Sequence, residues 1–390
     1  MRLAGRMGRL GTETAFDVLV KARAFEAAGR DVIHLEIGEP DFDSPAPVVA
    51  AGQAALAEGH THYGPAAGLP ELRRAIAEWV GRSRGIEVEP TQVVVAPGAK
   101  PIIFFTALAL LEAGDEAILP DPAFPIYESM VRFVGATPVH WRLREERDFR
   151  PDLTELPGLV TDRTRLLILN SPQNPTGGIL TGADLDAIAA AVAGTQITVL
   201  ADEIYSQMVY EGRHESLLTR PGLPKRTILL DGFSKTFAMT GWRIGYGVLP
   251  PDLVPHFDRL LVNSVSCTPA FVQHAAIAAL AEGWAAAEAM MGEFRARRDY
   301  IVPALNAIPG ISCRTPGGAF YVFPKVSDLG VPAETFADRL LNEFGVAALA
   351  GTAFGPGGAG HLRLSFANSL PNLRRAVDRI AACAEAVRGV

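Results

Sequence analysis

The chain has 390 residues, a formal net charge of −7 at pH 7 and a hydrophobic share of 48%. This composition is typical of a folded globular protein, and the length leaves room for two domains. The acidic balance argues against nucleic acid as a partner, because proteins that bind it usually carry a basic face. The 3 cysteines are far apart and form neither a disulfide framework nor a metal motif, so we expect no metal.

The amino terminus carries Arg2, Arg6 and Arg9, but no sustained apolar segment follows them before Glu13. This pattern is not that of a signal peptide. The longest apolar stretch, 101–111, is too short to cross a bilayer. We therefore expect a cytoplasmic protein that makes no membrane contact.

Two helices are predicted before any strand. Ser44 followed by Pro45 is typical of a helix start, and this helix would run to Gly59. A second helix fits 69–80, because its apolar residues recur at a spacing of four. Five short apolar runs then alternate with helical segments: 93–95, 117–119, 166–169, 197–200 and 227–230. Apolar strands that alternate with helices indicate a parallel sheet covered on both faces.

A long helical segment, 285–307, carries the chain away from this sheet. Short strands follow it, mixed with helices: 319–323, 346–349 and 361–366, before a last helix at 370–387. We expect an α/β fold, a mostly parallel sheet sandwiched by helices, with a smaller α+β domain. The large domain would comprise 41–284. The small domain would comprise 1–40 and 285–390, with a mobile N-terminal segment.

Chemistry should lie just after each apolar run, because open parallel sheets bind ligands beyond the carboxyl ends of their strands. After the first run, Gly98 and Ala99 precede a helix whose exposed amides could bind phosphate. After the second, Phe124 could stack on a flat ring. After the fourth, Asp202 could pair with a pyridinium nitrogen and Tyr205 could bond a ring oxygen. Plain turns, a core phenylalanine and a helix cap are the alternatives for these residues.

The fifth run leads into a segment in which Lys235 and Arg243 lie 8 residues apart. A lysine beside a sheet edge can lose its proton and condense with an aldehyde to a Schiff base. An arginine on the following turn offers a planar fork for phosphate. Together they suggest an aldehyde cofactor with a phosphate, pyridoxal phosphate, although a solvated surface loop would explain these residues equally well.

The glycine-rich segment 355–360 matches a dinucleotide-binding fingerprint. That motif functions only between a strand and a helix, and here a strand-like segment follows. We expect a loop there, and the hypothesis that the protein is a dehydrogenase therefore has little support.

Three segments in order, 170–177, 202–205 and 234–246, make the chain resemble the class I aminotransferases of the aspartate aminotransferase family. These are pyridoxal-phosphate enzymes of fold type I. The resemblance extends from Gly38 to Phe366. It implies an enzyme that moves an amino group from an L-amino acid to a 2-oxo acid by a ping-pong mechanism.

By this resemblance, Lys235 forms the Schiff base with the cofactor and later carries a proton between substrate and cofactor. Asp202 pairs with the pyridine nitrogen. Asn174 and Tyr205 donate hydrogen bonds to the phenolic oxygen, and Phe124 stacks on the ring.

The resemblance also assigns the two ends of the pocket. Five residues would line the phosphate end: Gly98, Ala99, Lys100, Ser234 and Arg243. Tyr63 matches the tyrosine that this family lends to the neighbouring subunit, which implies an obligate homodimer with shared sites. At the substrate end, Arg363 would bind the α-carboxylate, with Gly38 and Asn174 completing the pocket.

The amino donor stays open at this point. Lys100 matches a lysine used on a substrate's distal carboxylate in the bacterial branch, and Thr12 and Thr14 match hydroxyl positions of that branch, which favours aspartate or glutamate. Glu13 and Phe16 flank those threonines and would not favour a second carboxylate, so an aromatic or other neutral donor also stays open. A carbon–sulfur β-lyase on the same fold is the alternative reaction, and a cofactor-binding regulatory domain the non-enzymatic one.

Overall fold

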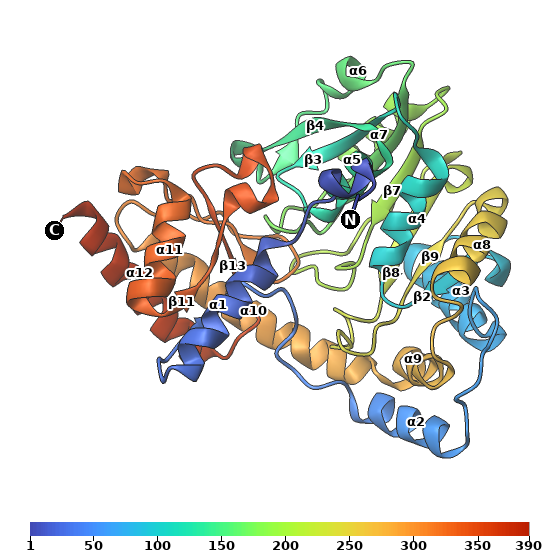
Figure 1. The fold of residues 1–390 in the computed structure, drawn as a ribbon, viewed down its shortest axis with the longest axis horizontal. Coiled ribbons are helices and arrows are strands. Elements are labelled where there is room, and N and C mark those ends of the chain that lie inside the picture. The colour runs from blue at the N-terminus through green and yellow to red at the C-terminus, as the bar shows by residue number, and fades with distance from the viewer. Residues whose placement is uncertain (390) are drawn as a thin grey trace.

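The computed structural model describes residues 1–389, and an eight-stranded sheet forms its centre (Figure 1). The strand order across this sheet is β2 (Val93–Ala96), β9 (Gly245–Val248), β8 (Thr227–Gly232), β7 (Thr198–Asp202), β6 (Thr164–Asn170), β3 (Glu116–Asp121), β4 (Thr137–Arg144) and β5 (Arg150–Pro151). The run from β8 to β4 is parallel throughout. Strand β9 is antiparallel to both its neighbours, and β5 is antiparallel to β4. The predicted mostly parallel α/β sheet is confirmed.

Helices cover both faces of this sheet, because successive side chains of a strand point to opposite sides. In β6, Leu166 and Ile168 pack in one cluster with residues of α4 and α5. Leu167 and Leu169 pack in another with residues of α7. The covering helices are α3 (Pro70–Arg84), α4 (Lys100–Leu110), α5 (Ile126–Val134), α6 (Leu156–Leu159), α7 (Gly182–Val192), α8 (Val254–Ser264) and α9 (Ala270–Glu282). Helix α2 (Ala46–Ala57) packs against α9.

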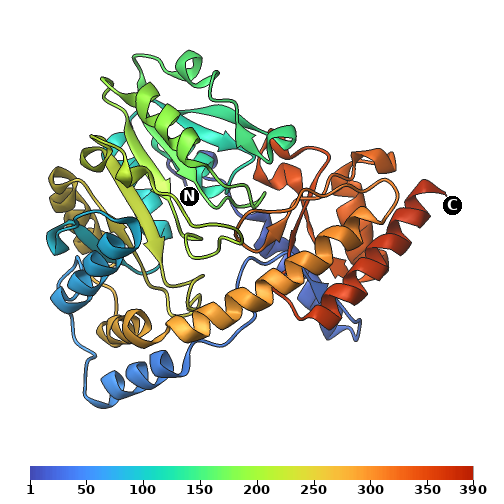
Figure 2. The ribbon, with the colours of Figure 1, turned by 180° about the vertical axis from the view of Figure 1, so that it is seen from behind.

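The long helix α10 (Trp284–Asn306) runs from the large sheet to the C-terminal part of the chain, as Figure 2 shows. That part contains β10 (Tyr321–Val322), β11 (Val346–Ala347), β12 (Leu349–Ala350), β13 (Leu362–Ser365), α11 (Ala333–Phe344) and α12 (Leu370–Arg388). The N-terminal helix α1 (Thr14–Ala27) and β1 (Ile33–His34) return to this part, where β1 pairs with β11. One hydrophobic cluster joins both regions, since it contains Ile168 of β6 and also Phe336 and Leu340 of α11.

Two details differ from the prediction. The single strand expected at 346–349 is divided into β11 and β12, because β11 pairs with β1 while β12 pairs with β13. Strands β4 and β9 were not predicted, because neither is a continuous apolar run: β4 contains three charged or imidazole side chains among its eight residues, and β9 carries two glycines. The glycine-rich loop is confirmed, because a 3-10 turn over Pro356–Gly358 leads into strand β13 and not into a helix. Over residues 1–389, none of the helices has the length and apolar character needed to span a membrane.

Candidate active site

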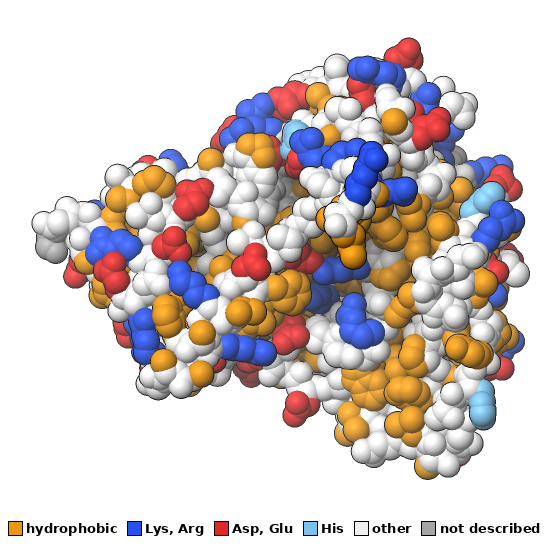
Figure 3. Space-filling model, in the orientation of Figure 1, with side chains coloured by type: hydrophobic (Ala, Val, Ile, Leu, Met, Phe, Trp, Pro, Cys, Tyr) orange, Lys and Arg blue, Asp and Glu red, His pale blue; other side chains and the backbone are white. Residues whose placement is uncertain are grey.

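A cavity of about 490 Å³ opens at the carboxyl ends of the parallel strands, between the large sheet and the C-terminal part. Figure 3 shows Lys and Arg side chains gathered in this hollow, with hydrophobic side chains around them. Most of the predicted site residues line it: Gly38, Ala99, Lys100, Phe124, Asn174, Asp202, Tyr205, Ser234, Lys235, Arg243 and Arg363. The cavity thus gathers residues from segments far apart in the sequence.

Lys235 lies in the turn that follows β8, and its Nζ donates a hydrogen bond of 2.5 Å to the Gly38 carbonyl oxygen. Burial lowers the pKa of Lys235 to about 8, with Arg363, Lys100 and Arg243 adding to this effect and Glu39 opposing it. The amine is therefore still mostly protonated at pH 7, but its neutral fraction is far larger than that of an ordinary lysine. A neutral amine is the form that attacks an aldehyde carbon.

Asp202 is the last residue of β7 and is 5% exposed. Tyr127 Oη donates a hydrogen bond of 2.6 Å to its Oδ2, and the Ile204 amide donates one of 3.1 Å to its Oδ1. Burial raises the pKa of Asp202 to about 6, although these two hydrogen bonds oppose the rise. A buried carboxylate of this kind is stabilised by a cation placed against it, such as a protonated ring nitrogen. Tyr127 was not among the residues predicted for the site.

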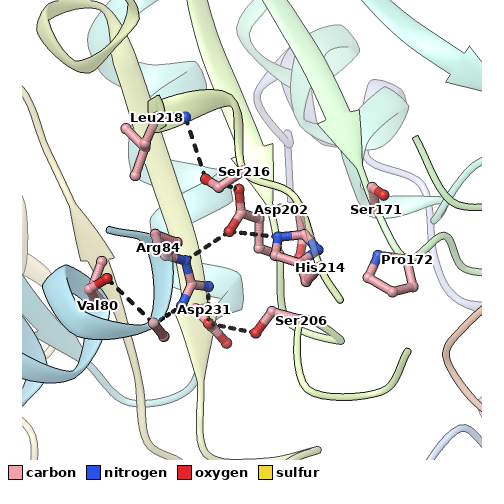
Figure 4. Close-up of polar contacts among 12 residues, drawn as sticks. Val80, Arg84, Ser171, Pro172, Asp202, Ser206, His214, Ser216, Leu218 and Asp231 are labelled. Atoms are coloured by element: carbon pink, nitrogen blue, oxygen red, sulfur yellow. Dashed lines mark hydrogen bonds and ion pairs between the residues drawn. The ribbon is translucent and has the colours of Figure 1, made fainter. Parts of the chain in front are cut away.

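A network of buried charges lies behind Asp202 (Figure 4). Arg84 of α3 donates from Nε to Glu203 at 3.0 Å and from Nη2 to Asp231 at 2.7 Å. His214 Nε2 lies 2.9 Å from Glu203, and Ser206 Oγ donates to Asp231 at 3.1 Å. This network ties the end of β7, which carries Asp202, to the end of β8, which leads to Lys235.

The two carboxylates of this network respond differently to their surroundings. Burial alone would raise the pKa of Glu203, but the nearby His214 and Arg84 lower it to about 2. For Asp231, burial prevails over the attraction of Arg84, and its pKa is raised. The network could not be predicted from the sequence, because Arg84 is far from Glu203 and Asp231 along the chain and meets them only in the folded protein. The single signal was a charged residue at the end of an amphipathic helix.

Arg363 stands in β13 at the opposite wall of the cavity and is 4% exposed. Its Nη1 donates to Asn174 Oδ1 at 3.3 Å, and its Nη2 donates to the Glu36 carbonyl oxygen. Its Nε has no partner within residues 1–389. Burial lowers the pKa of Arg363, yet a guanidinium stays charged in proteins. The buried fork therefore suits a carboxylate that binds with two oxygens.

Gly38 and two tyrosines shape the space between Lys235 and Arg363. A Cβ atom at Gly38 would overlap Tyr321 Oη, so only glycine fits there. Tyr205 Oη and Tyr321 Oη are 2.8 Å apart. Burial raises the pKa of Tyr205 well above its ordinary value, so its hydroxyl stays protonated. A protonated hydroxyl can donate a hydrogen bond to an oxyanion.

The start of α4 and the arginine turn meet at the other end of the cavity. Gly98 has a φ of +89°, and a Cβ atom there would overlap Arg243 Nη2. A Cβ atom at Gly245 would lie 2.6 Å from the Ala99 amide nitrogen. The free amides at a helix start, with an arginine beside them, form a binding site for an anion such as phosphate.

Two predicted residues are placed apart from this end. Tyr63 is 89% exposed and does not line the cavity of its own chain. Lys100 lines the cavity, but its Nζ forms an ion pair with Glu13, 5.5 Å from the centroid of the Phe124 ring. Thr12 and Thr14 do not line the cavity, whereas Glu13 and Phe16 do: Glu13, Ala15, Phe16, Ile37 and Glu39 form its N-terminal wall.

The site fits pyridoxal phosphate at each of its functional groups. Lys235 supplies a partly neutral amine for the aldehyde, and Asp202 a buried carboxylate for the ring nitrogen. The close approach of Gly98 to Arg243 places a guanidinium beside the start of α4, an arrangement that suits a phosphate. The fold and this site together define a pyridoxal-phosphate enzyme of fold type I.

Comparisons with known proteins identify the family. A model of the family "Aminotransferase class I and II" matches residues 30–380. An aspartate aminotransferase of Pyrococcus horikoshii is 42% identical over 361 residues, with 91% of this chain and 92% of that protein covered. An arginine–pyruvate transaminase of Pseudomonas aeruginosa is 39% identical over 375 residues, covering 96% and 95%.

Solved structures agree with the sequence relatives. The crystal structure of an aromatic aminotransferase from Pyrococcus horikoshii superposes with a TM-score of 0.88 at 41% identity, covering 90% of this chain and 95% of that one. The chain belongs to the class I and II aminotransferases. It is a transaminase that uses pyridoxal phosphate, the cofactor of this family and fold.

Proposed function

We propose that this aminotransferase carries out both of its half-reactions in the cavity around Lys235. An L-amino acid leaves its amino group on the cofactor and departs as a 2-oxo acid, and a second 2-oxo acid collects the group. The observation that carries the proposal is the neutral-prone Lys235 amine, held between the strand end that bears Asp202 and the wall that bears Arg363.

When bound, pyridoxal phosphate supplies an electron sink for the substrate α-carbon. Lys235 is proposed to hold the cofactor covalently until an amino acid displaces it. The freed Nζ would then move a proton between the substrate α-carbon and the cofactor carbon that carries the amino nitrogen. The lowered pKa of Lys235 favours this work, because general bases act best when their pKa is near the operating pH.

Four residues are proposed to hold the cofactor ring. Asp202 would keep the ring nitrogen protonated, with Tyr127 fixing its carboxylate through the 2.6 Å hydrogen bond. Tyr205 and Asn174 would donate to the ring oxygen, and Phe124 would lie against the ring face. The phosphate is proposed to bind to Gly98, Ala99, Ser234, Arg243 and the backbone amide of Lys100, whose ammonium group is paired with Glu13.

Arg363 is proposed to bind the α-carboxylate of every substrate, because a buried guanidinium is costly to leave without an anion. Gly38 and Asn174 would border the same carboxylate. Both half-reactions can then share one position for the reacting carbon, since amino acids and 2-oxo acids carry the same carboxylate.

The assembly and the division of the chain are also proposals. We propose a homodimer in which Tyr63, 89% exposed in one chain, reaches the phosphate of the partner's site. We further propose a large domain over 41–284 and a small domain made of 1–40 and 285–390. We also propose a cytoplasmic location.

The proposal is tested with Lys235→Ala in comparison with Lys225→Ala, which removes an exposed lysine outside the cavity. With pyridoxal phosphate added, the visible spectrum of Lys225→Ala should match the wild type and shift when an amino acid is added. Lys235→Ala should lose covalent attachment of the cofactor and turnover. Turnover by Lys235→Ala equal to the wild type would refute the role, and release of pyruvate and ammonia without an acceptor would indicate a lyase.

A further inference from the structure

The N-terminal wall of the cavity has no role in the function proposed above. Glu13 lies at the N-cap position of α1, and its carboxylate forms an ion pair with Lys100 Nζ. The Glu13 side chain is 16% exposed, so the pair is partly withdrawn from water on the side of the carboxylate. By its place in Figure 1, the N-terminal segment runs along the edge of the hollow that holds Lys and Arg side chains in Figure 3.

A bound amino acid would direct its side chain at this wall. With its carboxylate on Arg363 and its α-carbon beside Lys235, the substrate would still have Glu13, Phe16 and Ile37 among the lining residues open to its side chain. Two electrostatic effects agree with this arrangement. Glu13 opposes the burial that lowers the pKa of Arg363, and Lys100 contributes to lowering the pKa of Lys235.

The ion pair decides which side chains this wall accepts. A second carboxylate on the substrate would need a free cation, but Glu13 already neutralises Lys100. It would also approach the Glu13 carboxylate itself, and two like charges in a partly buried site repel strongly. Displacing Glu13 from Lys100 would leave Glu13 without its partner.

Uncharged side chains meet no such cost. Phe16 and Phe124 both lie near Lys100, with ring centroids 5.7 Å and 5.5 Å from its Nζ. Ala15 and Ile37 add apolar surface to the same wall. A flat or branched apolar side chain can therefore be buried among aromatic rings, which favours binding in proportion to the apolar area covered.

We propose that Glu13 is a specificity-determining residue, which disfavours acidic donors by occupying Lys100 and leaves the cavity selective for bulky uncharged side chains, aromatic ones above all. This inference rests on the aminotransferase reaction proposed for the same cavity. It goes beyond the names of the relatives, since those are an aspartate, an arginine–pyruvate and an aromatic aminotransferase.

The first test measures binding without chemistry. Succinate and 3-phenylpropionate carry no amino group, so titration of the holoenzyme with each reports affinity alone. The wild type should bind 3-phenylpropionate more tightly. Glu13→Gln should improve the dissociation constant of succinate by about 10- to 100-fold, the effect of one charged hydrogen bond, because it frees Lys100. Its affinity for 3-phenylpropionate should change little.

The second test follows the half-reaction with phenylalanine and with aspartate, through the visible spectrum of the bound cofactor. The ratio of their kcat/KM values should move toward aspartate by a similar factor in Glu13→Gln. Adding Lys100→Met to Glu13→Gln should cancel that gain. Asp17→Asn is the matched control, because it removes an exposed carboxylate from the same helix outside the cavity.

The outcomes separate the two proposals. If no amino acid alters the cofactor spectrum, the proposed function fails. If phenylalanine reacts but Glu13→Gln leaves both the succinate affinity and the donor ratio unchanged, only the role of Glu13 fails. A wild type that reacts best with aspartate, or with a cationic donor that Glu13→Gln loses, would also overturn the selectivity proposed here.

Discussion

Replacement of Arg84 by methionine is expected to destabilise the folded protein severely. The Arg84 side chain is 3% exposed, and it pairs with Glu203 and Asp231, whose side chains are 5% and 4% exposed. Methionine fills a similar volume but leaves both carboxylates without their cation. Breaking a buried ion pair by removing one partner costs about 3–5 kcal/mol of unfolding free energy. That loss corresponds to a change of about a hundredfold to a few thousandfold in the folding equilibrium.

The effect should depend on pH in a defined direction. In the wild type, Arg84 and His214 lower the pKa of Glu203 to about 2, so the stabilisation by Glu203 is present above its unfolded pKa and is lost on acidification. Without Arg84, burial is opposed less strongly, and the pKa of both carboxylates should rise in the folded state. The folded variant then binds more protons than the folded wild type, so its deficit in stability should shrink as the pH falls toward about 5.

Denaturant unfolding of the apoprotein measures this deficit, because bound cofactor would add its own stabilisation. Arg74→Met is the matched control, since Arg74 is exposed on the same helix. Adding Glu203→Gln and Asp231→Asn to Arg84→Met should restore part of the lost free energy. The reasoning is refuted if Arg84→Met unfolds at the same denaturant concentration as Arg74→Met, or if its deficit grows on acidification.

Three further predictions concern the cavity. Gly38→Ala should raise the KM of amino acids, because the new Cβ would overlap Tyr321 Oη. Adding Tyr321→Phe removes that hydroxyl and should lower the KM again. Equal KM values in all variants would contradict this. Tyr127→Phe removes a hydrogen bond that lowers the pKa of Asp202, so cofactor affinity should fall by about tenfold or more, and further at pH 6 than at pH 8, in equilibrium titrations. Uptake of pyridoxal phosphate by the apoprotein should accelerate as the pH rises through about 8, the pKa of Lys235, and then level off; a rate independent of pH would argue against a protonated resting amine.

The sequence allowed most of the fold to be predicted, because buried parallel strands are continuous apolar runs. Strand β9 was not predicted, because two of its four residues are glycines; it pairs with β8 and β2. Candidate site residues could be found in the same way, because they directly follow the predicted strands. Three of the predicted site residues, Asp202, Lys235 and Arg363, do line the same cavity. Their roles remain predictions.

Contacts made across the fold could not be found in this way. The hydrogen bond between Tyr127 and Asp202 joins residues 75 positions apart, and the ion pair between Lys100 and Glu13 joins residues 87 apart. Neither pair shares a helix face or a strand register. The partner of Lys100 decides whether its charge is available to a substrate, so the donor could not be derived from Lys100 alone.

The pairing of β1 with β11, and the hydrogen bond from Arg363 to the Glu36 carbonyl oxygen, join the beginning of the chain to its end. During synthesis, the strands of the large sheet are complete once Val248 has left the ribosome, but β11 and β13 are made more than ninety residues later. Residues 33–38 therefore cannot form their contacts with β11 and Arg363 until these later segments have been synthesised. The wall of the cavity that carries Arg363 is therefore the last to be made, so the cavity around Lys235 stays incomplete until β13 has been synthesised.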